Sequence, residues 1–169
     1  EGLTFFSASA LTQQSPTKQG YAIEIEQVAT RPEVVAARGI SLEEIENGVS
    51  FVLKENNRVM KMDTDQEKNL KGNIKQVLDN FRLNSATFSR EQTESKLHDI
   101  LATALQIKAD ENSLDVKISI NDIGMLTVKH KQYGIKPSFG ISTNLQGLFG
   151  EEVGTIKLSE RGQDVSGYI

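Results

Sequence analysis

The chain lacks cysteine and tryptophan and has only 3 prolines among its 169 residues. Without thiols it can form no disulfide framework, no thiolate-ligated zinc or iron–sulfur site and no cysteine nucleophile. No apolar stretch approaches the roughly 18 residues that span a bilayer, and no basic segment followed by an apolar one marks a signal peptide at the N-terminus. We therefore expect neither thiol chemistry nor a membrane partner.

Positive charge is too dispersed for a nucleic-acid partner. The 19 Lys and Arg residues are outnumbered by 23 Asp and Glu residues, and the two signs are interspersed, whereas phosphate binding needs clustered cations. With 37% apolar and 25% charged residues, the composition is that of a folded soluble chain. Because Glu1 is not an initiator Met and the final VSGYI resembles a strand cut short, we expect a fragment of a longer protein.

The first third of the chain predicts one strand and one hairpin. A polar lead-in over 1–20 is followed by alternating residues over 21–28, the period of a half-buried strand. Residues 30–47 read as a connection, with a short helical turn at SLEEIENG. The alternating segments GVSFVL and RVMKMD flank the turn-forming 55–58, which predicts a hairpin over 48–63.

Two amphipathic helices are predicted next. Thr64 and Glu67 have the spacing of a capping box, followed by an apolar stripe at Leu70, Ile74, Val77, Leu78 and Phe81. Ser89 and Gln92 repeat the capping pattern and predict a second helix near 90–108, with its own stripe at Leu97, Ile100, Leu101, Ala104 and Leu105.

The remaining signals are mostly strands. Alternation over 114–120 and 125–130 predicts a second hairpin, and PSFGIS, VGTIKLS and DVSGYI predict three further strands, with 161–163 as a turn. The order predicts an α+β fold, a mostly antiparallel β-sheet covered by two amphipathic helices. We expect the chain ends, 1–47 and 143–169, to form a second small β-rich region from which 48–142 emerges as an inserted α+β domain.

No motif supports a catalytic, cofactor-binding or metal-binding site. The only histidines, His98 and His130, lack metal-ligand spacing, and we expect both to be structural or at the surface. No G-x-S-x-G elbow follows a strand. The adjacent acids lie at turns or at element starts, where carboxylates favour helix N-termini and solubility over catalysis: Glu43 and Glu44, Asp63 and Asp65, and Glu151 and Glu152.

Two further candidate sites are also rejected. A calcium loop starting at Asp63 would need Gly at its sixth position and Glu at its twelfth, but these are Lys68 and Ile74. The glycines at 134, 140, 147 and 150 lack the strand–loop–helix context of a nucleotide site and are predicted to be turn residues. Phe139 and Phe149 are expected in the core. We therefore expect no enzyme and no cofactor.

Three stretches resemble a known family. GYAIEIEQVATR resembles the strand that opens the folded part of the flagellar hook-associated protein 2 family, the filament-capping proteins, through Gly20, Tyr21, Gln27, Val28 and Ala29. RGQDVSGYI resembles a late strand of that family. NGVSFVLKENNRVMKMD and INDIGMLTVKHKQYGIKPSFGIST are similar to the flagellin hook IN module that caps, hook proteins and some flagellins share. Residues 82–113 match no part of this pattern.

The resemblance implies a secreted, extracellular component of the bacterial flagellum that serves cell motility. It implies an outer fragment of a filament cap that promotes flagellin assembly at the filament tip, with flagellin or other filament and hook subunits as partners and a homo-oligomer in the full-length protein. The alternatives are an outer or variable domain of a flagellin or hook protein, an adhesive carbohydrate-binding module, and a hydrolase using a carboxylate pair. Binding residues stay unassigned. The expected apolar contacts of the longer protein are Leu3, Phe5, Phe6, Leu148 and Phe149.

Overall fold

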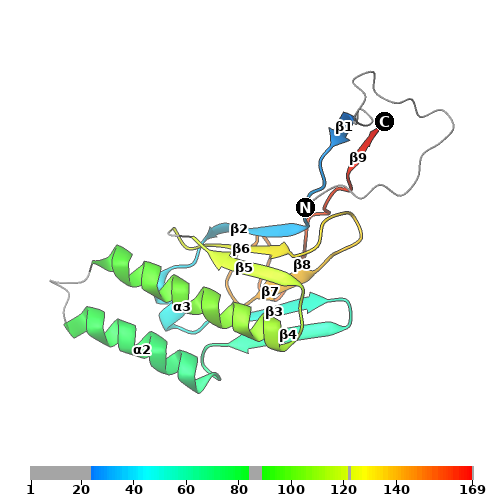
Figure 1. Cartoon of the computed structure of the whole chain (residues 1–169). Helices are drawn as coiled ribbons and strands as arrows, with labels where there is room; N and C mark the ends of the chain where they lie inside the picture. The colour runs from blue at the N-terminus through cyan, green and yellow to red at the C-terminus, as the bar shows by residue number, and fades with distance from the viewer. Residues whose placement is uncertain (1–23, 84–88, 122, 169) are drawn as a thin grey trace.

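The computed structural model describes residues 24–83, 89–121 and 123–168 (Figure 1). Its strands are β1 (Glu24–Gln27), β2 (Glu33–Gly39), β3 (Ser50–Glu55), β4 (Arg58–Asp63), β5 (Val116–Ile120), β6 (Met125–His130), β7 (Gly140–Thr143), β8 (Lys157–Leu158) and β9 (Ser166–Tyr168). Its helices are α1 (Leu42–Glu46), α2 (Lys68–Leu83) and α3 (Arg90–Glu111).

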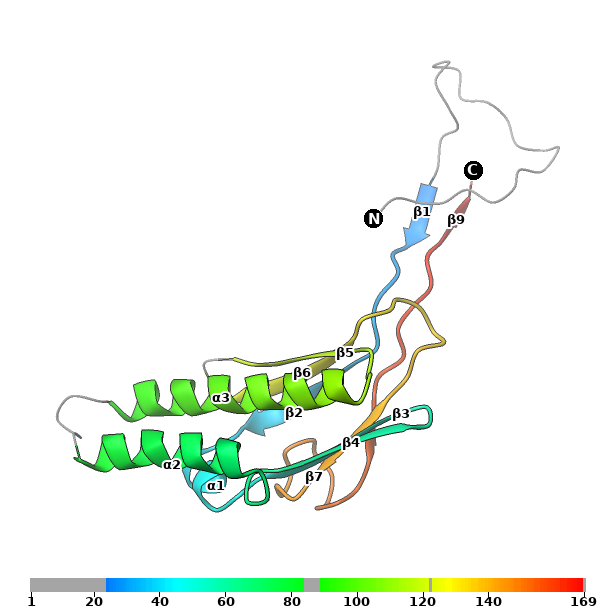
Figure 2. The same cartoon turned by 60° about the horizontal axis from the view of Figure 1, so that its bottom comes forward.

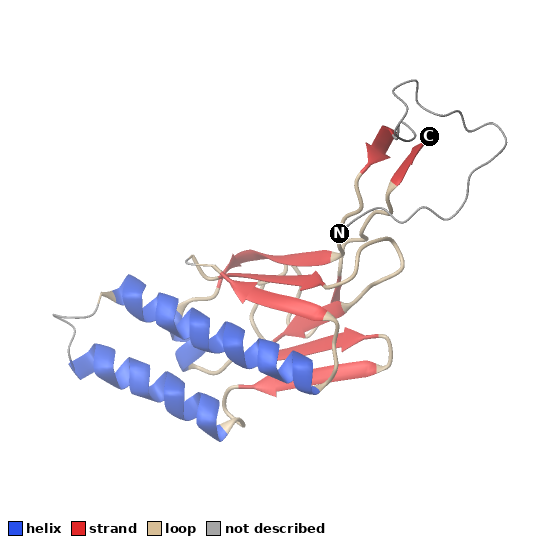
Figure 3. Ribbon diagram, in the orientation of Figure 1, coloured by secondary structure: helices blue, strands red, loops and turns tan. Residues whose placement is uncertain are grey.

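The strands form two sheets and a separate ribbon. One sheet has the order β2-β6-β5, the second has the order β4-β3-β7-β8, and β1 pairs with β9 in a two-stranded ribbon. Every one of these pairings is antiparallel. The two long helices, α2 and α3, lie side by side; α3 packs along β5, and α2 packs mainly against α3, as Figures 2 and 3 show. The predicted α+β class is confirmed, although the strands divide between two sheets and a ribbon.

Both sheets and all three helices share one hydrophobic core. Its members come from β2 and α1 (Val34, Ala36, Leu42, Ile45), from the first hairpin (Phe51, Leu53, Met60, Met62), from the long helices (Leu70, Ile74, Leu97, Leu101, Leu105) and from the later strands (Val116, Leu126, Val128, Ile141). The stripes on α2 and α3 are therefore the buried faces of these helices, as their spacing predicts.

Both predicted hairpins are present. In the first, Phe51 lies opposite Met62 and Leu53 opposite Met60, and all four are buried. Asn56 adopts a φ of 53° at the turn, a conformation that Asn tolerates better than most residues. In the second hairpin, Val116 lies opposite His130 and Ile118 opposite Val128. Period-2 alternation predicts these strands because each has one buried and one wet face.

The prediction of a connection over 30–47 is wrong for residues 33–39, which form β2. Val34 lies opposite Val128 of β6, so β2 extends the second hairpin into a three-stranded sheet. Val34 and Ala36 are buried while Val35 between them is exposed. This apolar residue on the wet face conceals the alternation that would otherwise predict a strand. The helical turn is confirmed as α1, with Ser41 and Glu44 forming a capping box.

The two predicted capping boxes of the long helices have different outcomes. Ser89 and Gln92 form the capping box of α3, which continues to Glu111. The box at Thr64 and Glu67 does not form. The Thr64 side chain instead accepts a 2.9 Å hydrogen bond from the backbone N–H of Val49, 15 residues earlier. Because the Thr64 hydroxyl already accepts from Val49, it does not cap the start of α2.

The ends of the described chain pair with each other. Glu24 lies opposite Tyr168 and Ile25 opposite Gly167, and an isolated bridge joins Thr30 to Gln163. The β1–β9 ribbon projects away from the sheets (Figures 1 and 2). The chain therefore enters and leaves the sheet-and-helix body at one place.

A neck of three chain segments joins the ribbon to this body. The backbone N–H groups of Gly134 and Gln163 both donate to the Thr30 carbonyl, at 3.0 and 3.3 Å. A Cβ on Gly162 would lie 2.4 Å from the Gly134 carbonyl oxygen, so this close approach requires glycine. The segments around residues 30, 134 and 162 are thus packed backbone against backbone.

The predicted domain division stays a prediction. Its boundaries at residues 47 and 143 do not coincide with changes of sheet, because β2 pairs with β6 and β8 pairs with β7. Leu145, Leu148 and Phe149 belong to the same core as the helices. The strand pairings favour boundaries near residues 29 and 164, where the ribbon meets the neck.

Candidate functional site

The two histidines lie apart, on α3 and at the end of β6, and both are buried. No group of three or more His, Asp or Glu residues in the described part of the chain could hold a metal ion. Each histidine instead connects elements that are distant in sequence.

His130 is enclosed by hydrogen bonds. Its Nδ1 accepts from the backbone N–H of Gln132 at 2.9 Å, so Nε2 carries the hydrogen in the neutral ring and donates to Glu55 Oε1 at 2.9 Å. The other oxygen of Glu55 accepts from the backbone N–H of Asp115 at 2.8 Å. Glu55 and His130 are 3% and 2% exposed, and every polar atom of the pair has a partner. This arrangement is a structural clamp between the two hairpins.

His98 on α3 contacts both the end of β2 and the β5–β6 turn. Its Nε2 lies 2.8 Å from the carbonyl oxygen of Ile40, which can only accept, so Nε2 is the donor. Gly124 packs on the ring with a φ of 75°, and a Cβ there would lie 2.8 Å from His98 Cε1. The backbone N–H of Ile40 in turn donates to the Gly124 carbonyl at 3.0 Å. The His98 ring therefore packs against the place where the end of β2 is hydrogen-bonded to the β5–β6 turn.

The adjacent acids do not converge on a cleft. Glu43 pairs with Arg90, Glu44 with Arg38, Asp65 with Lys71 and Glu151 with Lys157. Asp63 accepts from the backbone N–H of Asp65 at 2.9 Å. Three of these cations lie six residues from their carboxylates, whereas Arg90 of α3 lies 47 residues from Glu43. Glu152 forms no ion pair with any described residue.

The predicted glycines and aromatic residues have mixed outcomes. Gly134, Gly147 and Gly150 have positive φ in turns, but Gly140 lies in β7, where a Cβ would meet Ile156 at 2.6 Å. Phe139 and Phe149 are buried, as expected. The expectation that Leu148 and Phe149 serve as contacts of the longer protein is wrong, because both lie in the core. Leu3, Phe5 and Phe6 lie outside the described residues.

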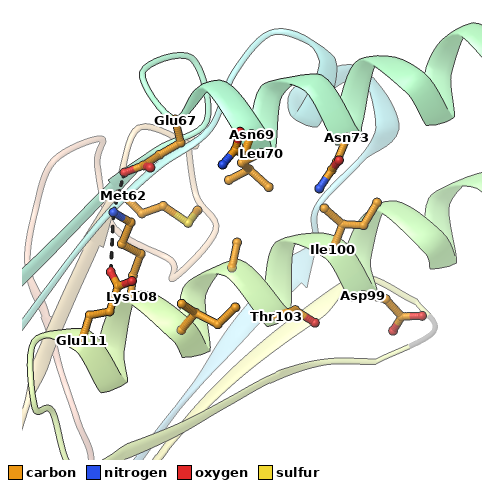
Figure 4. A pocket seen from close by; sticks show the side chains of 12 residues that line it. Met62, Glu67, Asn69, Leu70, Asn73, Asp99, Ile100, Thr103, Lys108 and Glu111 are labelled. Carbon is orange, nitrogen blue, oxygen red and sulfur yellow. Dashed lines mark ion pairs between the residues drawn. The ribbon is translucent and has the colours of Figure 1, made fainter.

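A groove with a volume of about 480 Å³ lies between α2 and α3 (Figure 4). Its apolar lining comes from Met62, Leu70, Ile100, Ala104 and Ile107. Asn69 and Asn73 project into it from α2 (Figure 4), and Thr103 of α3 also lines it. The groove combines an aliphatic floor with side-chain amides, a composition typical of ligand-binding pockets.

Charged residues mark the two ends of this groove. At one end, Lys108 bridges Glu67 at 2.8 Å and Glu111 at 3.7 Å, and its hydrogen bond to Glu67 raises the pKa of Lys108 above the ordinary value. At the other end lies Asp99 (Figure 4), which forms no ion pair with any described residue. Three carboxylates against one lysine give the lining a net negative charge.

Sequence reasoning does not find this groove. The available signals are Asn69 and Asn73, four residues apart beside the apolar Leu70, and Ile107, which extends the α3 stripe by one turn. These signals predict which residues share one face of each helix. The groove depends on how far apart α2 and α3 pack, which no local pattern encodes.

None of the described helices has the length and apolar character needed to span a bilayer.

Two solved structures resemble the chain, both of the D2–D3 domains of the flagellar cap protein FliD from Serratia marcescens, in two crystal forms. One has a TM-score of 0.44 and 13% identity, and the match covers 86% of this chain and 71% of that chain. The other has a TM-score of 0.40 and 12% identity, with coverage of 86% and 70%. Both are flagellar cap proteins, the family that the sequence motifs resemble. No family model and no curated protein matches the chain. At these TM-scores the likeness does not decide function, which depends on the chain's own residues.

Proposed function

We propose that the chain is a non-enzymatic outer fragment of a flagellar filament cap, secreted from the cell, that promotes flagellin assembly at the filament tip. The observation that carries this proposal is the β1–β9 ribbon. The two terminal segments with the sequence character of the capping family are hydrogen-bonded neighbours, although Glu24 and Tyr168 stand at opposite ends of the described chain. In such an arrangement the body is displayed at the end of a two-stranded stalk.

The side chains support a role in presenting surfaces. The buried titratable side chains of His130, Glu55 and His98 all form hydrogen bonds that join structural elements. The adjacent acids Glu43 and Glu44 pair with Arg90 and Arg38 instead of facing one another. A cap needs a rigid body and exposed surfaces, and these contacts provide rigidity.

Immunogold electron microscopy in the organism that encodes the chain tests this proposal. An epitope inserted at the exposed turn around Gly154 in the full-length protein should label only the filament tip. Deletion of the gene should leave flagellin unpolymerised in the medium, with filaments missing.

The alternatives give different images. Label along the whole filament contradicts the cap and supports a flagellin or hook subunit. Filaments of normal length in the deletion strain also contradict the cap. If filaments are intact and the purified chain binds a glycan array, the adhesive role is favoured instead.

A further inference from the structure

The groove between α2 and α3 contains two side-chain amides that have no partner among the described residues. Asn69 and Asn73 are exposed, and neither forms a side-chain hydrogen bond with any residue in the described part of the chain. Both point into the groove rather than along the helix surface (Figure 4). Each amide offers a donor and an acceptor side by side.

The spacing of these amides matches an extended polypeptide. Four residues of α-helix rise about 6 Å, at 1.5 Å per residue. Two residues of extended chain advance about 6.6 Å, and alternate residues present the same edge. Asn69 and Asn73 can therefore bond successive outward-facing peptide groups of one strand. A helical ligand has these peptide groups bonded internally, so its backbone could not bond either amide.

The floor and the ends define the ligand further. Leu70, Ile100 and Ala104 offer aliphatic surface for alternate side chains of such a strand. At one end of the groove, Lys108 contacts both Glu67 and Glu111, so that end keeps one negative charge in excess but its carboxylates already have a cation. Asp99, without an ion pair among the described residues, is available at the other. Asp99 is thus the carboxylate of the lining without a cation partner among the described residues, so a positive charge on the ligand is best placed at the Asp99 end.

We propose that this groove binds an extended polypeptide segment that carries an aliphatic side chain at every second residue and a Lys or Arg near Asp99. The amides hold the ligand backbone, the floor takes its apolar side chains and Asp99 sets its direction. This binding site does not depend on the flagellar role and would stand if that role were disproved.

Fluorescence anisotropy with a labelled octapeptide of alternating Leu and Ser, carrying one terminal Lys, tests the proposal on the 169-residue chain. We expect saturable binding, and we expect N69A/N73A to weaken it about tenfold, because two hydrogen bonds are lost. The matched control Q76A changes an exposed amide on α2 that does not line the groove, and should bind as the unchanged chain does. Circular dichroism checks that each variant stays folded.

A charge exchange tests the direction of the ligand. A peptide with Glu in place of Lys should bind the unchanged chain several-fold more weakly and should regain affinity for Asp99→Lys. Failure of the peptide to bind with a Kd below about 1 mM overturns the proposal. Equal binding by N69A/N73A, or stronger binding of a helix-constrained peptide of the same composition, also overturns it.

Discussion

Glu55 Oε1 and His130 Nε2 share a buried hydrogen bond of 2.9 Å across 75 residues of sequence. Glu55 ends β3 and His130 ends β6, so the bond joins the two hairpins at one edge of the core. Both remaining polar atoms of the pair are satisfied by backbone N–H groups, of Asp115 and Gln132. Loss of one side chain therefore leaves several buried groups unpaired at once.

We expect His130→Ala to lower the free energy of unfolding by about 3 kcal/mol or more, because a buried acid loses its partner and a cavity is left. Glu55→Gln keeps the volume and one acceptor, so we expect a smaller loss of about 1–2 kcal/mol. Urea denaturation measures both. Nitrogen-15 NMR of the imidazole should show the hydrogen on Nε2. A loss below about 1 kcal/mol for His130→Ala would contradict the structural role assigned to the pair.

Elements whose buried faces are regular can be predicted from the sequence. Phe51, Leu53, Met60 and Met62 alternate on paired strands, and Leu97, Leu101 and Leu105 recur at helical spacing, so local periodicity is sufficient. The strand β2 is not predicted by this alternation, because Val35 is an apolar residue on its exposed face.

Tertiary partners account for the remaining errors. Thr64 has the spacing of a helix cap, but the Val49 N–H is its partner, and no local spacing contains that information. Leu148 and Phe149 are apolar residues in a loop-like segment, but the chain folds them back into the core. The candidate groove depends likewise on the packing of α2 against α3, so only its individual residues are visible in the sequence.

Two glycines should respond to alanine with opposite signs. Gly72 lies inside α2 with no atom within 4 Å of the position that an alanine methyl group would take, so Gly72→Ala should raise the free energy of unfolding by about 0.5–1 kcal/mol. Gly124 has a φ of 75° and touches the His98 ring, so Gly124→Ala should lower it by about 1–3 kcal/mol. Thermal unfolding checks both, and each variant is the other's control. If both variants change the free energy of unfolding in the same direction, the environments assigned to Gly72 and Gly124 are wrong.

The edge of β5 is covered by one side chain, that of Gln106 on α3. Its Oε1 accepts from the Ile118 N–H at 2.8 Å, and its Nε2 donates to the Val116 carbonyl at 3.2 Å. Because β5 is the last strand in the order β2-β6-β5, this amide occupies backbone groups that another strand could otherwise bind.

We expect Gln106→Ala to lose about 1–2 kcal/mol of stability and to self-associate as its concentration rises, because the β5 edge is uncovered. Gln106→Glu should be at least as destabilising, since a carboxylate places a second acceptor against the Val116 carbonyl. Denaturation and light scattering measure these effects, with Gln76→Ala as the control at an exposed position of α2. A monomeric Gln106→Ala of unchanged stability would show that the edge needs no cover.

Acid should weaken the contact between β2 and α1. The hydrogen bond from Arg38 lowers the pKa of Glu44 below its ordinary value of 4.5, and the same carboxylate accepts a 2.9 Å bond from the Ser41 N–H. A carboxylate with a lowered pKa in the folded state stabilises the protein above the unfolded pKa, and this contribution is lost as the pH falls through the folded value.

Glu44→Gln removes that contribution, so we expect its stability to fall less than that of the unchanged chain when the pH drops from about 5 to about 3. At pH 7 the variant should be the less stable of the two. Glu160→Gln is the matched control, because Glu160 is exposed and forms no ion pair with any described residue. Urea denaturation over this pH range measures the slopes. Parallel slopes for Glu44→Gln and the unchanged chain would mean that the Arg38 pair adds nothing to stability, whereas a slope reduced only in Glu44→Gln attributes the acid sensitivity to this ion pair.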